Sequence, residues 1–199
     1  MNAKAYLGDI IGGSIMLRES RVIAKLLKSH PDDQQWLQAI VDENILQKPS
    51  VHSAKRMAST VRKRIEPLGE AFWADLEVAQ DELANQLLLF AVMKQSPVLS
   101  DFMMTTVSDA RRMYREVLRL DDWQEFIDSR FRVIEGLEKY STASIQKIGS
   151  NIFKILADAG FLESGRSKKL KNVYLQPELT DWCNQFDCTH ILNAMEGAR

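Results

Sequence analysis

The sequence predicts a mainly α-helical globular protein, and three observations support this fold class. The 199 residues include only 9 Gly and 5 Pro, while strong helix formers such as Leu, Ala, Glu and Lys are plentiful. Apolar residues recur at helical spacing along most of the chain,. The 45% apolar and 27% charged content is ordinary for a soluble folded protein and excludes wholesale disorder,.

Composition also limits where the protein is expected to act. The longest uninterrupted apolar run covers residues 87–93, and a membrane span needs about 20 residues. No secretory signal is visible, and two cysteines are too few for a disulfide framework,. We therefore expect a cytoplasmic protein with no membrane contact.

Three amphipathic helices are predicted in the first third of the chain. Ser14 is a good N-cap for a helix that ends just before Pro31,. Pro31 and the two aspartates that follow it open a second helix,. Ser50 or Ser53 is expected to cap the third, a basic helix near residues 52–66,.

The middle of the chain is predicted to be helical with short interruptions. Residues 70–95 follow a helical pattern with a break near 78–81. Within them, residues 87–93 are apolar all round, which is typical of the buried centre of a fold. Further helices are predicted at 98–106, 108–120 and 123–138.

The last sixty residues predict a winged helix-turn-helix. Ser141 or Thr142 starts a helix that ends at Gly160, a good helix-terminating glycine,. A basic loop at 163–172 and an alternating strand at 173–176 read as a β-hairpin wing,. Two short helices follow. We expect a helical domain at 1–138 and a winged-helix-like subdomain at 139–199, packed together without a clear linker.

The net charge of -1 hides strong local segregation. Residues 48–66 hold six basic residues against one acid, and residues 139–171 hold seven against two. Residues 70–82 carry five acids and no base. Two basic blocks on an otherwise balanced chain are typical of a site that binds a polyanion.

The basic blocks supply the candidate DNA contacts. The loop could touch phosphates as a wing does, while the helix before it lies against a groove. The alternatives are a solvated helix face for the first block and an ordinary hairpin with a lysine-rich tip for the second. The candidate DNA-binding residues are Lys55, Arg56, Arg62, Lys63, Lys147, Lys154, Arg166, Lys168, Lys169 and Lys171.

Motifs that would indicate an enzyme are missing. The sequence contains no phosphate-binding P-loop, no dinucleotide fingerprint and no HExxH zinc motif,. Cys183, Cys188 and His190 have a C-x4-C-x-H spacing, but a zinc site needs a fourth ligand,. We therefore expect a protein that is not an enzyme and has no metal or cofactor.

Four segments of the sequence resemble the BrxA proteins, small components of BREX phage-defence systems. They are YLGDIIGGSIMLRESRVIAKLL, ENILQKPSVHSAKRMASTVRKRI, SIQKIGSNIFKILADAGFL and ILNAMEG. The resemblance runs over nearly the whole chain, and it rests on the order and spacing of these segments. It implies a non-enzymatic, mainly helical protein that binds double-stranded DNA within a larger antiviral defence complex. It carries no catalytic motif.

Three hypotheses follow. The first is a double-stranded DNA-binding protein that contacts mainly the phosphate backbone. The second is an adaptor that scaffolds other BREX subunits without binding DNA, in which the acidic stretch 70–82 docks a partner. The third is RNA binding, which is less favoured because Tyr174 is the one candidate stacking aromatic near a basic block,. The oligomeric state, and whether the two basic blocks share a face, are left open.

Overall fold

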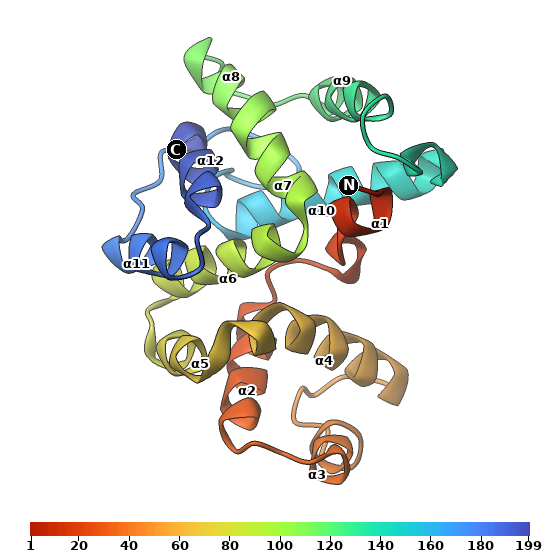
Figure 1. Ribbon diagram of the computed structural model, residues 1–199, viewed down its shortest axis with the longest axis vertical. Coiled ribbons are helices and arrows are strands. Elements are labelled where there is room, and N and C mark those ends of the chain that lie inside the picture. The colour runs from red at the N-terminus through yellow and green to blue at the C-terminus, as the bar shows by residue number, and fades with distance from the viewer. The chain divides into compact units, whose positions relative to one another are not determined.

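All regular secondary structure in this computed structural model is helical, and all 199 residues are described (Figure 1). The chain forms two compact units. The smaller unit is Met16–Ala91, and the larger unit combines Met1–Ile15 with Val92–Arg199. The mainly helical fold class is confirmed. The boundary expected near residues 138–141 falls inside the larger unit and stays a prediction.

The smaller unit packs α2 against α4 and α5. Its core is formed by side chains that are fully buried, such as Ile23 of α2, Val61 of α4 and Phe72 of α5. These positions follow the helical apolar spacing of each segment, so each helix buries one stripe. Its elements are α2 (Leu17–Lys28), α3 (Asp33–Leu37), the π turn η2 (Gln38–Asp42), α4 (Val51–Ile65), η3 (Glu66–Leu68), α5 (Gly69–Val78) and the start of α6 (Asp81–Gln95).

Two of the predicted helix starts are confirmed and one is wrong. Asp32 forms a capping box with Gln35 at the start of α3, and Ser50 accepts the Ser53 backbone N–H at the start of α4. However, α2 begins at Leu17, after Met16 in the left-handed region, and Ser14 does not cap it. Met16 and the residue before it are buried. Burial of these apolar side chains therefore sets the entry into α2.

The larger unit is built around a cluster of aromatic rings. Phe102 meets Trp123, Phe126 and Phe153 edge-on, at centroid distances of 5.7, 5.2 and 5.9 Å. Such edge-to-face contacts stabilise the core beyond simple burial. The elements are α1 (Ala3–Leu7), η1 (Ile10–Gly12), α7 (Pro97–Phe102), the π turn η4 (Met103–Val107), α8 (Ser108–Arg112), α9 (Leu120–Arg130), η5 (Leu137–Lys139), α10 (Thr142–Asp158), α11 (Pro177–Gln185) and α12 (Thr189–Ala198).

The apolar run at residues 87–93 is buried along its whole length, as predicted: no residue in it is more than 1% exposed. The break predicted near 78–81 is also present, because α5 ends at Val78 and α6 begins at Asp81. No single helix has both the length and the apolar character of a membrane span, although α6 together with the bent-away Pro97–Arg112 meets these criteria.

Two predicted helices are shorter than expected. The helix predicted at 108–120 ends at Arg112, where the backbone turns through Tyr114 in the left-handed region. The helix predicted at 123–138 ends at Arg130. Its expected last turns are instead an irregular segment whose Glu135 carbonyl accepts the Ala3 N–H at 2.8 Å. A tertiary hydrogen bond replaces helical ones there.

The predicted β-hairpin wing is wrong. Residues 173–176 have no regular secondary structure, and the chain contains no β-strand. The loop at 163–172 closes through a single bridge between Leu162 and Leu170. Only three residues separate the end of α10 at Asp158 from the bridge residue Leu162, and an isolated two-stranded hairpin is marginal in water. After Lys171 the chain instead runs on towards α11.

Candidate nucleic-acid interface

The first basic block lies on one side of α4. Lys55, Arg56 and Lys63 are exposed, whereas Val61 and Ile65 on the opposite side are fully buried. This division follows from the helical period, because residues three, four and seven apart share a face. The helix thus presents exposed basic residues on one side and a core-facing stripe on the other.

Three other basic residues of this block have structural partners. Arg62 pairs with Glu66 at 2.7 Å, and its guanidinium lies 4.4 Å from the centre of the Trp36 ring. The hydrogen bond to Glu66 raises the Arg62 pKa. Lys48 pairs with Glu19 at 2.5 Å, and Arg64 is 3% exposed. The charge offered to a ligand is thus smaller than the sequence suggests, and Arg62 as a DNA contact stays a prediction.

The second basic block contains a row of polar side chains along α10. Ser141 caps this helix through the Ser144 backbone N–H, as predicted. Lys147, Ser150 and Lys154 are exposed at spacings of three and four residues, which place them on one face,. At 1.5 Å per residue the two lysines lie about 10 Å apart along the axis. Lys147 and Lys154 therefore form a positively charged row along the exposed face of α10.

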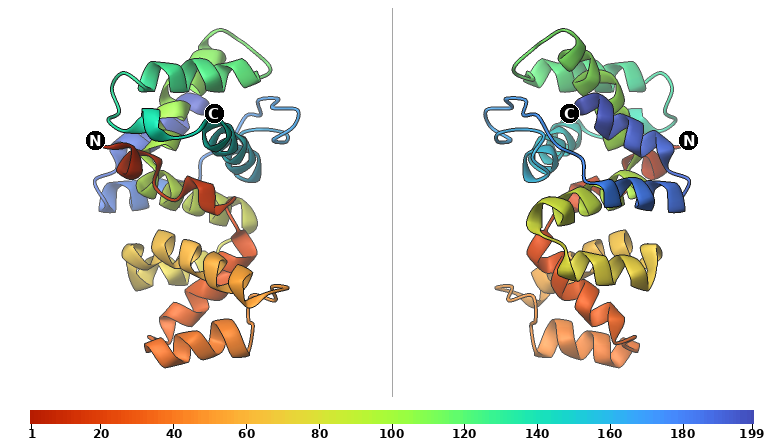
Figure 2. Two further views of the ribbon diagram at one scale, coloured as in Figure 1. Left: turned by 90° about the vertical axis from the view of Figure 1, so that its right-hand side faces the viewer. Right: turned by 90° about the vertical axis from the view of Figure 1, so that its left-hand side faces the viewer.

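The loop at 163–172 packs against the same helix. A Cβ atom on Gly165 would lie 3.5 Å from the Lys154 Cα, so the loop backbone runs in contact with α10. Arg166, Lys169 and Lys171 are exposed on this loop. Figure 2 shows the loop beside the end of α10, within the larger unit. The fold therefore brings the α10 lysine at 154 and the basic loop together.

The other edge of the loop is held by a segment that precedes α9. The bridge joins Val117 to Lys169, and further bonds run from Leu118 N–H to Lys168 O at 3.0 Å and from Leu170 N–H to Glu116 O at 2.8 Å. The loop backbone is satisfied on both sides, which fixes its position. A pairing partner from residues 116–118 replaces the expected strand.

Lys168 differs from its neighbours. Its Nζ lies 5.3 Å from the centre of the Phe153 ring and donates to the Arg166 carbonyl at 3.3 Å. Its backbone is in the left-handed region, with φ of 50°. This lysine folds back onto α10, and it is the member of the predicted loop set with the least freedom to reach a phosphate.

The exposed lysine and arginine side chains of the second basic block have no acidic partners. None of the ion pairs in the chain includes the basic side chains in question, which are Lys147, Lys154, Arg166, Lys169 and Lys171. An uncompensated cluster of this kind attracts counter-ions and polyanions.

The acidic stretch at residues 70–82, unlike the second basic block, forms ion pairs within the protein. Glu77 pairs with Lys28 at 2.8 Å, Asp81 with Arg21 at 2.7 Å, and Glu70 lies 3.8 Å from His30. These pairs form within the smaller unit. Lysine and arginine therefore balance two of the five acids of this stretch within the unit.

One basic segment was missed at the sequence level. Residues 111–119 hold four arginines against one acid, so local charge counting would have found it. Arg115 donates to both carboxylate oxygens of Asp122, at 3.0 and 2.6 Å. Arg111 donates to the backbone carbonyls of Lys171 and Ala198. The segment thus anchors both the basic loop and the last helix.

The candidate metal ligands do not assemble. No group of three or more His, Cys, Asp or Glu side chains is arranged to hold a metal ion. Cys183 and Cys188 are buried, while His190 is exposed. Burial, with a smaller effect of Cys188, raises the pKa of the Cys183 thiol to about 12. A thiol in this state is a poor nucleophile and a poor metal ligand at neutral pH.

Comparison with known proteins gives consistent matches. Residues 4–186 match the family model BrxA. The chain is 41% identical over 198 residues to the BREX protein BrxA of Escherichia coli O9:H4 (strain HS), covering 100% of this chain and 93% of that protein. It is 29% identical over 191 residues to the BREX protein BrxA of Paramagnetospirillum magneticum, covering 96% of each.

A solved structure shares the fold. The crystal structure of an uncharacterized protein from Magnetospirillum magneticum superposes with a TM-score of 0.83 at 28% identity. The superposition covers 96% of this chain and 97% of that one. The arrangement of helices described above is therefore also present in a crystal structure.

Proposed function

Because this chain belongs to the BrxA family, whose members are components of BREX phage-defence systems, we propose that it binds double-stranded DNA for that system. The contacts are mainly to the phosphate backbone, and binding has little sequence preference. The observation that supports this most directly is the set of five unpaired basic side chains on α10 and the adjoining loop. They lie on elements whose backbones are fixed in place.

The type of residue at this surface favours phosphate contact over base reading. Lysines with long, exposed side chains neutralise phosphates and release counter-ions, a contribution that is independent of sequence. The loop is short and has no strand beside it that could enter a groove. The exposed face of α4, with Lys55 and Lys63, is proposed as a second backbone contact.

The test is a fluorescence anisotropy titration of a short labelled duplex at several salt concentrations. Wild-type protein is expected to bind, with an affinity that falls as salt rises. The double variant Lys147→Glu with Lys154→Glu is expected to bind more weakly and to reduce the log–log salt slope by about 0.9 for each phosphate that it no longer neutralises. Unrelated duplexes should bind with similar affinity.

A matched control separates local contact from net charge. Lys4 and Lys25 are exposed lysines on α1 and α2, in no ion pair. Reversing both changes the net charge equally and should leave the salt slope close to that of the wild type. If the two double variants behave alike, or if folded wild-type protein binds no duplex even at low salt, the proposal is wrong.

Other BREX subunits are the proposed protein partners, and we propose that the protein acts in the cytoplasm without catalytic activity. The adaptor hypothesis without DNA binding depended on the acidic stretch at residues 70–82. Since the pairs with Lys28 and Arg21 already balance part of that charge, the structure favours the basic surface as the primary contact. Pull-down of BREX subunits by the Lys147→Glu, Lys154→Glu variant would separate the two roles.

A further inference from the structure

A hollow of about 460 Å³ lies between the end of α8, the basic loop and the end of the chain. The hollow is lined by Arg111, Tyr114, Arg115, Glu116, Lys169, Leu170, Asn172 and Arg199. The volume falls in the range typical of sites for small organic groups. The hollow lies wholly within the larger unit and none of the predicted contacts on α10 belongs to it.

Positive charge exceeds negative charge around this hollow, because Glu116 is the single acidic side chain in its lining. Arg111 donates to three neutral oxygens, on Ala198, Asn172 and Lys171. Neither Lys169 nor Arg199 takes part in any ion pair. Three cationic side chains that form no ion pair therefore line the hollow beside one carboxylate, and this excess of positive charge attracts a phosphate group,.

Tyr114 adds an aromatic surface at the same opening. Its side chain is 93% exposed, the highest value among the large hydrophobic residues of the chain. It makes no ring contact with another aromatic residue. The protein thus presents a nearly free phenol ring beside unbalanced positive charge.

The backbone conformation at Tyr114 is one that tyrosine rarely adopts,. The Arg115 N–H donates to the Ala110 carbonyl, and the Tyr114 N–H donates to the Arg111 carbonyl, each at 2.9 Å. These two bonds form a Schellman motif that ends α8, with Tyr114 at the left-handed position, φ 54°,. Glycine is the residue that this position favours. Local folding therefore does not account for the tyrosine side chain, and strained positions of this kind cluster at functional sites.

We propose that this hollow, named the Tyr114 pocket, holds an unpaired nucleotide of the bound DNA. The phosphate lies against Lys169 and Arg199, and the base stacks on the Tyr114 ring. A backbone grip on a duplex requires only cations, whereas a free aromatic ring beside cations is how proteins bind unstacked bases. The inference rests on the proposed function and adds a preference for DNA with an unpaired tail next to the duplex.

The experiment compares two labelled probes, a blunt duplex and the same duplex with a short single-stranded DNA tail. Wild-type protein is expected to bind the tailed probe about 5- to 150-fold more tightly, the range that stacking of one base supplies. Tyr114→Phe should keep this preference, because it keeps the ring. Tyr114→Gly should lose it while folding normally, because glycine suits the left-handed backbone. Val133→Ala, at another exposed apolar residue, is the control and should retain the preference.

The outcomes distinguish this inference from the function on which it rests. If wild-type protein binds neither probe, the proposed function fails and this inference fails with it. If it binds both probes equally, or if Tyr114→Gly keeps the preference for the tail, the Tyr114 pocket is overturned while duplex binding stands. Loss of binding to another BREX subunit by Tyr114→Gly, with both DNA affinities unchanged, would assign the ring to a protein partner and also overturn the inference.

Discussion

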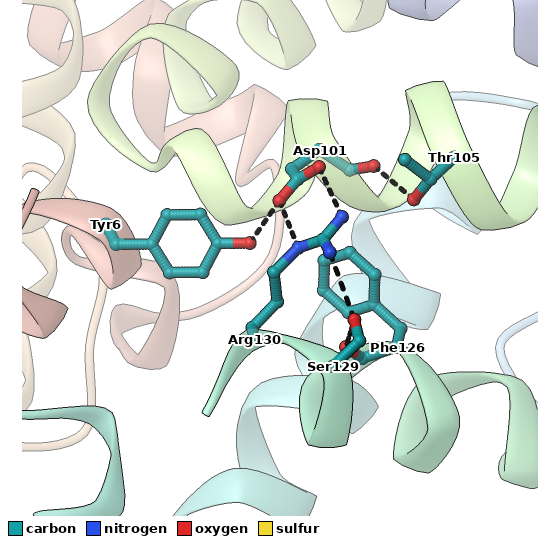
Figure 3. A network of polar contacts seen from close by, with 6 residues as sticks. All are labelled: Tyr6, Asp101, Thr105, Phe126, Ser129 and Arg130. Atoms are coloured by element: carbon teal, nitrogen blue, oxygen red, sulfur yellow. Dashed lines mark hydrogen bonds and ion pairs between the residues drawn. The ribbon is translucent and has the colours of Figure 1, made fainter. Parts of the chain in front are cut away.

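Arg130 donates from its Nε and Nη2 to the two carboxylate oxygens of Asp101, at 2.6 and 2.8 Å (Figure 3). The Tyr6 hydroxyl donates to the same carboxylate at 2.6 Å. Burial, with the hydrogen bond to Asp101, raises the pKa of Tyr6, so its hydroxyl remains a donor. This network joins α1, α7 and α9, which come from three distant parts of the chain.

The network should contribute measurably to stability. Asp101→Ala leaves the Arg130 guanidinium, about a fifth exposed, without its partner and is expected to cost about 2–3 kcal/mol, below the range for a fully buried pair. Tyr6→Phe removes one hydrogen bond and should cost about 1 kcal/mol. Urea unfolding measures both losses. Asp109→Ala, at the exposed pair with Arg112, is the control and should cost less than about 0.5 kcal/mol; equal losses at 101 and 109 would contradict the prediction.

Stability should fall in acid through Asp122. Burial acts to raise its pKa, but the Arg115 hydrogen bonds, the Arg119 backbone N–H and both positive charges outweigh burial and lower the pKa. A carboxyl group with a lowered folded-state pKa stabilises the fold above its unfolded value of about 3.9. That contribution is lost as pH falls through the folded-state pKa.

Urea midpoints measured from neutral pH down to about pH 2 test this linkage. The wild type is expected to lose stability below about pH 4 more steeply than Asp122→Asn, which is already weakened at neutral pH and has no carboxyl group to titrate there. Asp121→Asn, at the exposed neighbouring carboxylate, controls for the loss of one acidic residue. Parallel acid profiles for wild type and Asp122→Asn would contradict the assignment.

Gly149→Ala should destabilise the protein, although the same change in an open helix usually stabilises it by up to about 1 kcal/mol. The new Cβ would lie 2.5 Å from the Cδ1 and Nε1 atoms of Trp123. That indole donates to the Ile145 carbonyl and packs on Phe102, so it has little room to move. Overpacking of this kind costs about 1–3 kcal/mol. Thermal unfolding checks the sign, and Ser150→Ala on the exposed face should change the midpoint little.

Arg62 and Lys63 are adjacent on α4 and should behave oppositely. Arg62→Ala removes the ion pair with Glu66 and the stacking on Trp36, so we expect a stability loss of about 1 kcal/mol and little change in DNA affinity. Lys63→Ala, at an exposed residue, should weaken DNA binding and leave stability nearly unchanged. Urea unfolding and anisotropy on the same two proteins give both readouts. A loss of DNA affinity in Arg62→Ala as large as in Lys63→Ala would contradict this expectation and support Arg62 as a DNA contact.

Local sequence patterns predicted most helices and several of their caps. The starts of α3, α4 and α10 were readable because Asp32, Ser50 and Ser141 act on backbone N–H groups within three residues. The buried run at 87–93 was readable because its composition alone excludes an exposed face. The helix ends at Arg112 and Arg130 could not be predicted from local patterns. The first depends on Tyr114 in the left-handed region, and the second on the hydrogen bond from the Ala3 N–H to the Glu135 carbonyl.

The candidate DNA-binding surface could likewise be predicted only in part from the sequence. Charge counting located the basic loop and the face of α4, because lysines and arginines are visible in any sequence. It overcounted Lys48, Arg62 and Arg64, whose partners or burial arise only from packing. It overlooked residues 111–119, although their four arginines could have been counted in the same way.

Composition and local spacing were sufficient to predict the helical class, the burial of the central run and the location of the basic residues. These depend on residue types and on contacts between near neighbours in the chain. Long-range packing is what pairs residues 116–118 with the basic loop, places Lys168 against Phe153, and brings Arg111, Tyr114 and Lys169 to one hollow. Such contacts join segments that are far apart in the sequence, and their formation depends on which backbone groups the rest of the fold leaves unsatisfied.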